Sequence, residues 1–231
     1  MSLEFGLLIV SGYLLGSVPT GYLLVKWFHG IDIRQHGTGK IGASNVMRVA
    51  SKRLAILVTI LDIGKGALAV WIAQLLDLNA AEQITVGVFA IVGHNWSVFL
   101  GFKGGRGVFT TLGVITMMSP WLGLIVLAMP YTLAPIKQVA LGVFLTLISL
   151  PIFSWFLSQP LGIEDKDRLP VTLGLAALAL LGLLTRLITP RTRLSQSVPA
   201  AELFFNRLLF DRDIRDRKAW TERNLQQQRK D

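Results

Sequence analysis

The sequence predicts an all-α, polytopic integral membrane protein with about seven transmembrane helices. Of the 231 residues, 52% are hydrophobic and only 16% are charged, whereas a soluble domain has about a quarter charged residues. The positions of the cations predict the orientation, with the N-terminus outside and the C-terminus in the cytoplasm. There is no cysteine, which excludes disulfides and thiolate metal sites, and there are three histidines. We therefore expect no metal and no cofactor.

Apolar segments define the predicted transmembrane helices, because a span needs about 20 mainly apolar residues. The first segment begins after the acidic Glu4 and has no small-residue cleavage site after it. We therefore interpret it as a retained helix instead of a signal peptide. The segments that are long enough are 5–27, 54–76, 83–101, 138–157 and 170–188.

Residues 107–135 are apolar but broken at Ser119-Pro120. Proline removes a backbone donor and bends or ends a helix. We therefore predict two short helices, 107–118 and 121–135, which bring the total to seven. The alternative is one kinked span with a re-entrant piece, which leaves six or five full crossings.

Lysine and arginine gather between alternate pairs of spans. With the N-terminus outside, the outer segments contain only the cations Lys166 and Arg168, beside five carboxylates. The positive-inside rule favours this orientation. Seven spans also place the basic C-terminal segment inside, whereas six would place it outside. We therefore attribute the net charge of +9 to a membrane partner and expect no nucleic acid.

The composition changes near residue 190, so we divide the chain into a membrane domain, 1–190, and a basic cytoplasmic tail, 191–231. Within the tail, leucines and phenylalanines of 202–210 share one helical face, and Arg207 lies off it. This pattern is typical of a short helix that lies on an anionic membrane surface. The alternative is a polar tail with one hydrophobic docking patch. Residues 211–218 carry dense charge of both signs and predict a solvated helix.

The first candidate site is the glycine-rich loop 34–48. Glycine lets successive backbone N–H groups turn toward one ligand, and the neighbouring hydroxyl, amide and cationic groups suit a phosphate monoester. The alternative is a flexible basic loop that only obeys the positive-inside rule. The candidate residues are Gly37, Thr38, Gly39, Lys40, Gly42, Ser44, Asn45 and Arg48.

The second candidate site is the segment 102–107, which immediately precedes an apolar helix. Backbone N–H groups at a helix N-terminus attract anions. The residue order is not that of a Walker A loop, so ATP hydrolysis is not implied. The alternative is a tight basic turn. The candidate residues are Lys103, Gly104, Gly105, Arg106 and Gly107.

Charged residues inside the second span form a third candidate site. Asp62 and Lys65 are three residues apart, so they share a helical face and can pair. Intramembrane charge is a functional hypothesis by default, and the alternative is an ion pair that ties helices together. His94 ends the third span near the second glycine loop, where a lone histidine is more often a packing residue than a base.

The sequence contains no Gly-x-Ser-x-Gly, no His-Glu-x-x-His and no cysteine. An enzyme with this sequence would therefore position reactive substrates and form no covalent intermediate.

Together these segments resemble the acyl-phosphate–dependent glycerol-3-phosphate acyltransferases of bacteria, the PlsY family. The resemblance lies in residues 16–22, 32–48, 61–66 and 93–108. It implies a multi-pass protein of the bacterial plasma (inner) membrane, with seven helices and its motif loops in the cytoplasm. It also implies transfer of an acyl group from acyl phosphate to the 1-hydroxyl of glycerol 3-phosphate, which gives lysophosphatidic acid and phosphate.

The resemblance implies roles for the candidate residues. The second loop would hold one substrate phosphate, and the first loop would hold the other and stabilise the developing oxyanion. The expected catalytic residues are Thr38, Arg48 and Lys103. The expected binding residues are Asp62, Lys65, His94, Ser44, Asn45, Arg106 and the glycines at 37, 39, 42, 104, 105 and 107. Membrane lipids are the other expected partners, and the tail is expected to contact the anionic leaflet.

The sequence also departs from the family. Arg106 replaces a usual lysine, and the third motif, expected after the last helix with a histidine and an asparagine, is absent from 185–194. A catalytically altered or inactive member that binds lipid or phosphate is therefore an alternative interpretation. A small transporter is another, supported by Asp62, Lys65 and the helix count.

Overall fold

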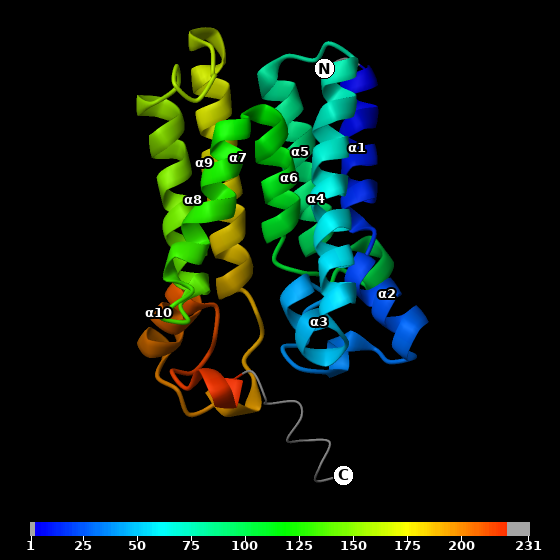
Figure 1. The fold of residues 1–231 in the computed structure, drawn as a ribbon, viewed down its shortest axis with the longest axis vertical. Helices are drawn as coiled ribbons and strands as arrows, with labels where there is room; N and C mark the ends of the chain where they lie inside the picture. The colour runs from blue at the N-terminus through cyan, green and yellow to red at the C-terminus, as the bar shows by residue number, and fades with distance from the viewer. Residues whose placement is uncertain (1–2, 221–231) are drawn as a thin grey trace.

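The computed structural model describes residues 3–220, and all regular elements in this range are helices. Seven of them run along the long axis of the molecule, while three lie at one end of it (Figure 1). The long-axis helices are α1 (Leu3–Ser17), α4 (Lys52–Leu75), α5 (Ala80–Asn95), α6 (Val108–Met118), α7 (Pro120–Ala128), α8 (Val139–Phe156) and α9 (Asp165–Leu187). The end helices are α2 (Thr20–His29), α3 (Ala43–Val49) and α10 (Ala200–Phe210).

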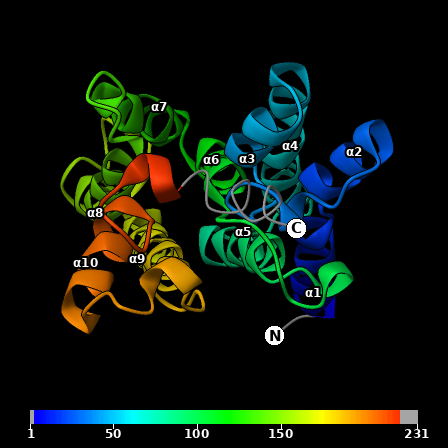
Figure 2. The same cartoon turned by 90° about the horizontal axis from the view of Figure 1, so that it is seen from below.

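Residues 217–220 are also helical, and the described range contains four short 3₁₀ turns. They are η1 (Ile33–Gln35), η2 (Val98–Leu100), η3 (Met129–Leu133) and η4 (Arg193–Ser195). Seen from below, α7 to α10 lie on one side and α1 to α5 on the other, with α6 between them (Figure 2). The end of the bundle that carries α2, α3 and α10 also carries both glycine loops.

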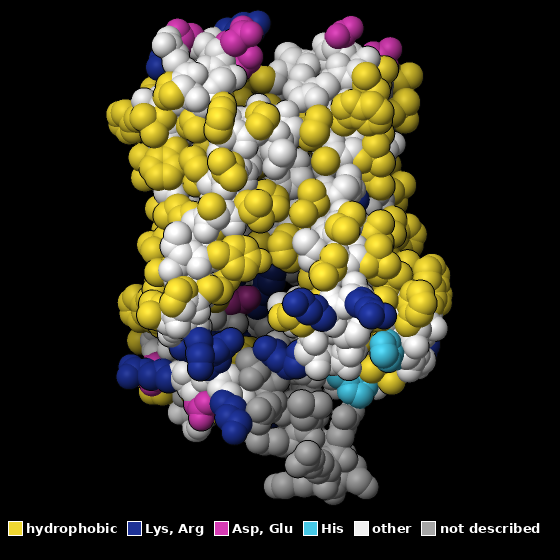
Figure 3. Space-filling view, in the orientation of Figure 1, with side chains coloured by type: hydrophobic (Ala, Val, Ile, Leu, Met, Phe, Trp, Pro, Cys, Tyr) yellow, Lys and Arg dark blue, Asp and Glu magenta, His cyan; other side chains and the backbone are white. Residues whose placement is uncertain are grey.

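The predicted fold class is confirmed. Five helical segments are long and apolar enough to cross a membrane, and two shorter apolar segments, Val108–Met118 and Pro120–Leu133, lie between them in the sequence. An apolar band crosses the face of the bundle that Figure 3 shows, and lysine and arginine gather below it. The exact number of crossings and the orientation stay predictions.

The predicted division of 107–135 into two helices is confirmed. The Ser119 hydroxyl accepts a hydrogen bond from the Leu122 N–H, and Pro120 occupies the first helical position, where its missing N–H costs nothing. The same hydroxyl donates to the Leu161 carbonyl at 2.7 Å. Ser119, at the break between α6 and α7, therefore also contacts the loop that precedes α9.

The prediction of one continuous helix over 5–27 is wrong. The segment breaks at Val18-Pro19 into α1 and α2, because Pro19 has no N–H for a carbonyl one turn earlier. Side chains use the carbonyls at this break: Lys65 donates to the Val18 oxygen at 3.1 Å, and Ser97 donates to the Ser17 oxygen at 2.6 Å. The break therefore connects the first helix to α4 and to the end of α5.

Helices α4 and α6 cross at glycines. A Cβ added to Gly66 would lie 2.2 Å from the Thr110 carbonyl oxygen, and one added to Gly113 would lie 2.1 Å from the Ile63 carbonyl oxygen. Small residues let membrane helices approach closely. Each helix thus contributes one glycine that the other helix's backbone requires.

We expect Gly66→Ala to destabilise the bundle by about 1–3 kcal/mol, because the added methyl group overpacks a backbone contact that cannot move alone. The measurement is thermal unfolding in detergent micelles. Gly64→Ala is the matched control, since Gly64 is exposed on the same helix and has no atom near its built Cβ. Equal unfolding temperatures for the two variants would contradict the close crossing.

The tail segment up to residue 220 is docked on the bundle. Helix α10 packs on α8 and α9, and Arg186 of α9 donates to the Leu208 carbonyl at 2.7 Å. Arg207, expected to face away from an apolar surface, is buried and donates to Asp213 at 2.8 Å and to the Leu187 carbonyl at 2.9 Å. The amphipathic helix therefore uses its Arg207 face for the protein, while Phe204 and Phe205 are exposed.

The helix predicted over 211–218 is wrong for residues 211–216, where the chain bends. Asp211 has a left-handed φ of 51° and ends α10, and the chain then turns so that Asp213 reaches Arg207. Burial raises the pKa of Asp213, but hydrogen bonds from Arg207 and Ser195 outweigh burial and lower it. Asp213 is therefore a buried carboxylate inside a turn, where the sequence predicted a solvated helical residue.

Candidate functional site

A cavity of about 530 Å³ opens where both glycine loops meet the end of α9. Figure 3 shows a hollow at the lower edge of the apolar band, with lysine and arginine around it. The cavity is lined by Asp32, Arg34, Gln35, Gly39, Lys40, Ile41, Asn95, Trp96, Phe102, Lys103, Gly104, Gly105, Arg106, Thr185, Ile188, Thr189 and Pro190.

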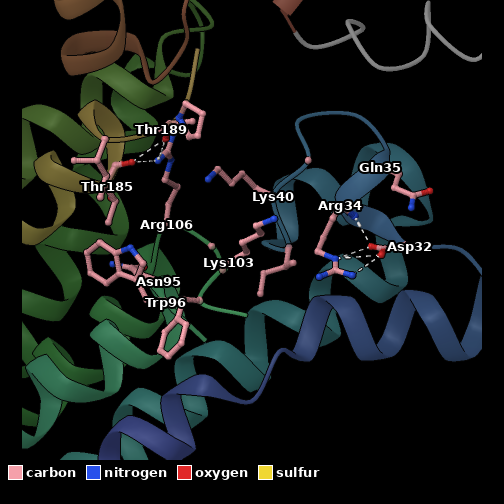
Figure 4. Close-up of a pocket in the computed structure, with 17 residues that line it drawn as sticks. Asp32, Arg34, Gln35, Lys40, Asn95, Trp96, Lys103, Arg106, Thr185 and Thr189 are labelled. Carbon is pink, nitrogen blue, oxygen red and sulfur yellow. Dashed lines mark hydrogen bonds and ion pairs between the residues drawn. The ribbon is translucent and has the colours of Figure 1, made fainter. Parts of the chain in front are cut away.

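Four cations from two loops line this cavity. In Figure 4 the side chains of Lys40 and Lys103 extend from different loops into one space, beside Arg106. Arg34 donates to Asp32, with the closest nitrogen and oxygen 2.6 Å apart, and this hydrogen bond lowers the pKa of Asp32. The cavity lining contains four cations and one carboxylate, a composition that suits a phosphate group.

The second glycine loop is pressed against the C-terminal end of α5. The Gly105 N–H donates to the His94 carbonyl at 3.1 Å, and a Cβ added to Gly104 would lie 2.1 Å from that same oxygen. A Cβ added to Gly105 would lie 2.1 Å from His94 Nε2. Gly107 has a left-handed φ of 69° and caps α6. These glycines therefore fix the path that brings Lys103 and Arg106 to the cavity.

Arg106 joins the second loop to the end of α9 and to the tail. Its Nη1 donates to the Thr185 carbonyl oxygen and to the Thr189 hydroxyl, the latter at 3.0 Å. Its Nη2 lies 2.5 Å from Asp211 Oδ1, and its Nε donates to Oδ2 at 3.1 Å. Contacts with residues about 80 and 105 positions later in the chain thus fix Arg106 in one wall of the cavity.

In the first loop, Asn45 shapes the backbone. Its side chain is fully buried, and its Nδ2 donates to the carbonyls of His36 at 3.0 Å and Lys40 at 2.8 Å. Its Oδ1 accepts from the Thr38 N–H at 2.8 Å. A Cβ on Gly37 would lie 2.3 Å from that oxygen. The amide predicted to bind phosphate is therefore occupied by the loop itself.

Of the other predicted first-loop residues, Thr38, Gly42, Ser44 and Arg48 are not among those that line the cavity. Gly39 lines it, as does Lys40. Thr38 is half-buried, while Ser44 and Arg48 are exposed on α3. Gly42 is the N-cap of α3 and has no atom near its built Cβ.

The predicted intramembrane charges form a buried network beneath the second loop. Asp62 Oδ1 accepts from the Thr20 hydroxyl at 2.7 Å and lies 2.9 Å from Lys65 Nζ. His94 Nδ1 lies 3.6 Å from the same oxygen and 3.2 Å from the Thr110 hydroxyl. The network joins α2, α4, α5 and α6. Asp62, Lys65 and His94 do not line the cavity. They lie behind the second loop and support it.

Several cavity residues were missed by the sequence reasoning. Asp32, Arg34, Thr185 and Thr189 line the cavity but were not candidates. Thr185 and Thr189 lie in the segment where the third motif was sought. Their position in that segment was the one sequence feature that could have identified them as site residues.

Asn95 was also missed, and it is only 5% exposed. Its amide nitrogen and oxygen have no hydrogen-bond partner in the part of the chain that the structure describes. Leaving such a buried amide unpaired is costly.

Comparison with known proteins gives concordant results. The family model described as glycerol-3-phosphate acyltransferase matches residues 6–194. The chain is 44% identical to glycerol-3-phosphate acyltransferase 4 of Dehalococcoides mccartyi (strain CBDB1) over 97% of this chain and 96% of that protein. It is 47% identical to a glycerol-3-phosphate acyltransferase of Synechococcus sp. (strain CC9902) over 65% of this chain and 68% of that protein.

A solved structure has the same fold. The crystal structure of PlsY, an integral membrane glycerol 3-phosphate acyltransferase, in its glycerol 3-phosphate form superposes with a TM-score of 0.70 at 30% identity. The superposition covers 79% of this chain and 88% of that chain.

Proposed function

The chain belongs to the glycerol-3-phosphate acyltransferase family, and from this premise we propose that its acyl donor is acyl phosphate and that the reaction takes place in the cavity between the two glycine loops. The observation that carries the proposal is the convergence of Lys40, Lys103 and Arg106 on one space at the end of an apolar bundle. Both substrates carry phosphate, and one carries a lipid chain, so such a cavity suits the pair.

The proposed chemistry needs no nucleophilic side chain. The 1-hydroxyl oxygen of glycerol 3-phosphate attacks the acyl carbonyl carbon and forms the new ester bond. The bond from that carbon to the phosphate oxygen breaks, and its electron pair leaves with phosphate. The hydroxyl proton passes to a phosphate oxygen of a substrate. The products are lysophosphatidic acid and phosphate, and the protein contributes position and positive charge.

We assign Lys103 and the backbone of Gly104 to one phosphate, because both residues line the cavity, whereas the Gly105 N–H already donates to the His94 carbonyl. Arg34 and Lys40, from the opposite loop, suit the second phosphate. Thr38 and Arg48 stay proposed catalytic residues together with Lys103, and Ser44 stays a proposed ligand. The Asn95 amide suits a hydroxyl or phosphate oxygen, since both of its polar atoms lack a partner among the residues placed by the structure.

The cellular setting follows from the same charges. We propose that the protein lies in the bacterial plasma membrane, with the cavity in the cytoplasm, because lysine and arginine gather at that end of the bundle. Residues 1–190 would be the membrane domain and 191–231 a cytoplasmic segment that contacts the anionic leaflet.

The decisive experiment supplies acyl phosphate and labelled glycerol 3-phosphate to the full chain in proteoliposomes. We expect lysophosphatidic acid to form, and Lys103→Ala to lower turnover by about 10²–10³-fold, as removal of an oxyanion-stabilising donor does. Lys166→Ala is the matched control, since Lys166 is exposed at the far end.

Two outcomes would count against this proposal. Full turnover by Lys103→Ala would remove Lys103 from the site. An acyl thioester that replaced acyl phosphate without loss of rate would overturn the assigned donor. Substrate binding without turnover would instead favour an inactive member, which the absent third motif allows.

A further inference from the structure

A second cavity, of about 460 Å³, lies where the turn before α8 meets the C-terminal segment. It shares no lining residue with the substrate cavity. Five of its six lining residues are cations, and four of those lie beyond residue 194, where the match to the family model ends. We call it the basic groove, and its lining is Lys137, Gln138, Arg212, Arg215, Arg217 and Lys218.

The charges of the basic groove are poorly compensated. Burial lowers the pKa of Arg212 and the neighbouring Arg217 lowers it further, while Asp216 partly opposes both. The buried Nε of Arg212 has no hydrogen-bond acceptor among residues 3–220. Glu202 pairs with Arg215 at 3.1 Å, and no carboxylate is among the residues that line the groove. An anion in the groove would supply both the missing acceptor and the missing charge.

The position of the basic groove points to lipid. Lys137 and Gln138 immediately precede α8, a candidate membrane span, and Ile136 beside them is 63% exposed. Two backbone hydrogen bonds, of 2.9 and 3.0 Å, fix the turn that presents Lys137. Arg212 lies over the Phe210 ring at 4.9 Å. The groove thus has an apolar border at the level where hydrocarbon gives way to water.

From this placement we propose that the basic groove binds the phosphate headgroup of an anionic phospholipid. Phospholipid phosphates lie at the level where a transmembrane helix begins, and clustered cations there select anionic headgroups over zwitterionic ones. This site is distinct from the substrate cavity, and binding to it requires no acyl transfer.

The test measures binding of short-chain phosphatidylglycerol to the purified full chain in detergent, with phosphatidylcholine of the same chain length as the comparison. Each cation near an anionic lipid contributes about fivefold in affinity. We therefore expect the double variant Arg212→Gln, Arg217→Gln to bind phosphatidylglycerol about 25-fold more weakly. Arg191→Gln with Arg193→Gln is the matched control, since both residues are exposed, lie outside the groove and remove the same charge.

A variant on the other wall keeps the proposal testable if the double variant unfolds. Lys137→Gln changes no residue of the C-terminal segment, and we expect it to weaken binding about fivefold. Equal weakening in the groove and control variants would overturn the proposal in favour of diffuse attraction. Inorganic phosphate that bound the groove as tightly as phosphatidylglycerol would overturn the lipid assignment.

Discussion

Asp62→Ala is expected to destabilise the bundle by about 3–5 kcal/mol, because removal of one partner leaves a buried charge uncompensated. Asp62 accepts from the Thr20 hydroxyl and pairs with Lys65, and His94 Nδ1 lies 3.6 Å from it. Without Asp62, the Val18 carbonyl at 3.1 Å would be the remaining acceptor for the Lys65 ammonium among residues 3–220. The measurement is the yield of monodisperse protein in detergent and its unfolding temperature.

The double variant Asp62→Ala, Lys65→Met separates the charge from the packing. Replacing both members of a buried ion pair with apolar residues is often neutral, so we expect most of the lost stability to return. If the single variant kept the wild-type unfolding temperature, the pair would not hold these helices together. A folded double variant with low turnover would show that the network also positions the loop above it.

Gly105→Ala is expected to lower turnover by about 100-fold or more, because a displacement of reacting groups by about 1 Å has an effect of that size. The new methyl group would meet His94 Nε2 at 2.1 Å. That ring is fully buried and cannot turn aside without leaving Asp62 and Thr110. The loop must therefore move, and Lys103 and Arg106 move with it.

Steady-state kinetics in proteoliposomes measure this effect, with Gly64→Ala as the control that adds the same methyl group where nothing is near. The unfolding temperature of Gly105→Ala should change much less than its turnover, since the exposed side of the loop can shift and relieve the strain. Wild-type turnover in Gly105→Ala would show that the path of this loop does not control the reaction.

The membrane helices followed closely from apolar segment length, and the one error among them, at 5–27, has a specific cause. The apolar run through 5–27 hid a break at Pro19, since hydropathy does not register the loss of a backbone donor. The break at Pro120 was predicted because proline removes a backbone donor, and the structure adds that Ser119 caps the next helix. In the tail, the apolar face was assigned either to a membrane surface or to a docking patch, but sequence spacing does not show the buried pair of Arg207 and Asp213.

The candidate site was predicted in part. Glycine and cation spacing identified the second loop, whose residues from Lys103 to Arg106 line the cavity. The same reasoning misjudged Asn45, because a side-chain amide that shapes a loop and one that binds a ligand look alike in sequence. Thr185 and Thr189 were missed because small hydroxyl residues at a helix end match no motif, and only the tertiary contact with Arg106 identifies them.

The contact between Arg106 and Asp211 has a consequence for the order of biosynthesis. Residue 211 leaves the ribosome 105 residues after residue 106, which corresponds to roughly 5–20 s at ordinary elongation rates. During that interval α6 and the helices after it are being synthesised, while the arginine of the second glycine loop lacks its carboxylate. The substrate cavity of the nascent chain therefore lacks the Arg106–Asp211 contact, and the docking of α10 is the folding step that completes this wall of the cavity.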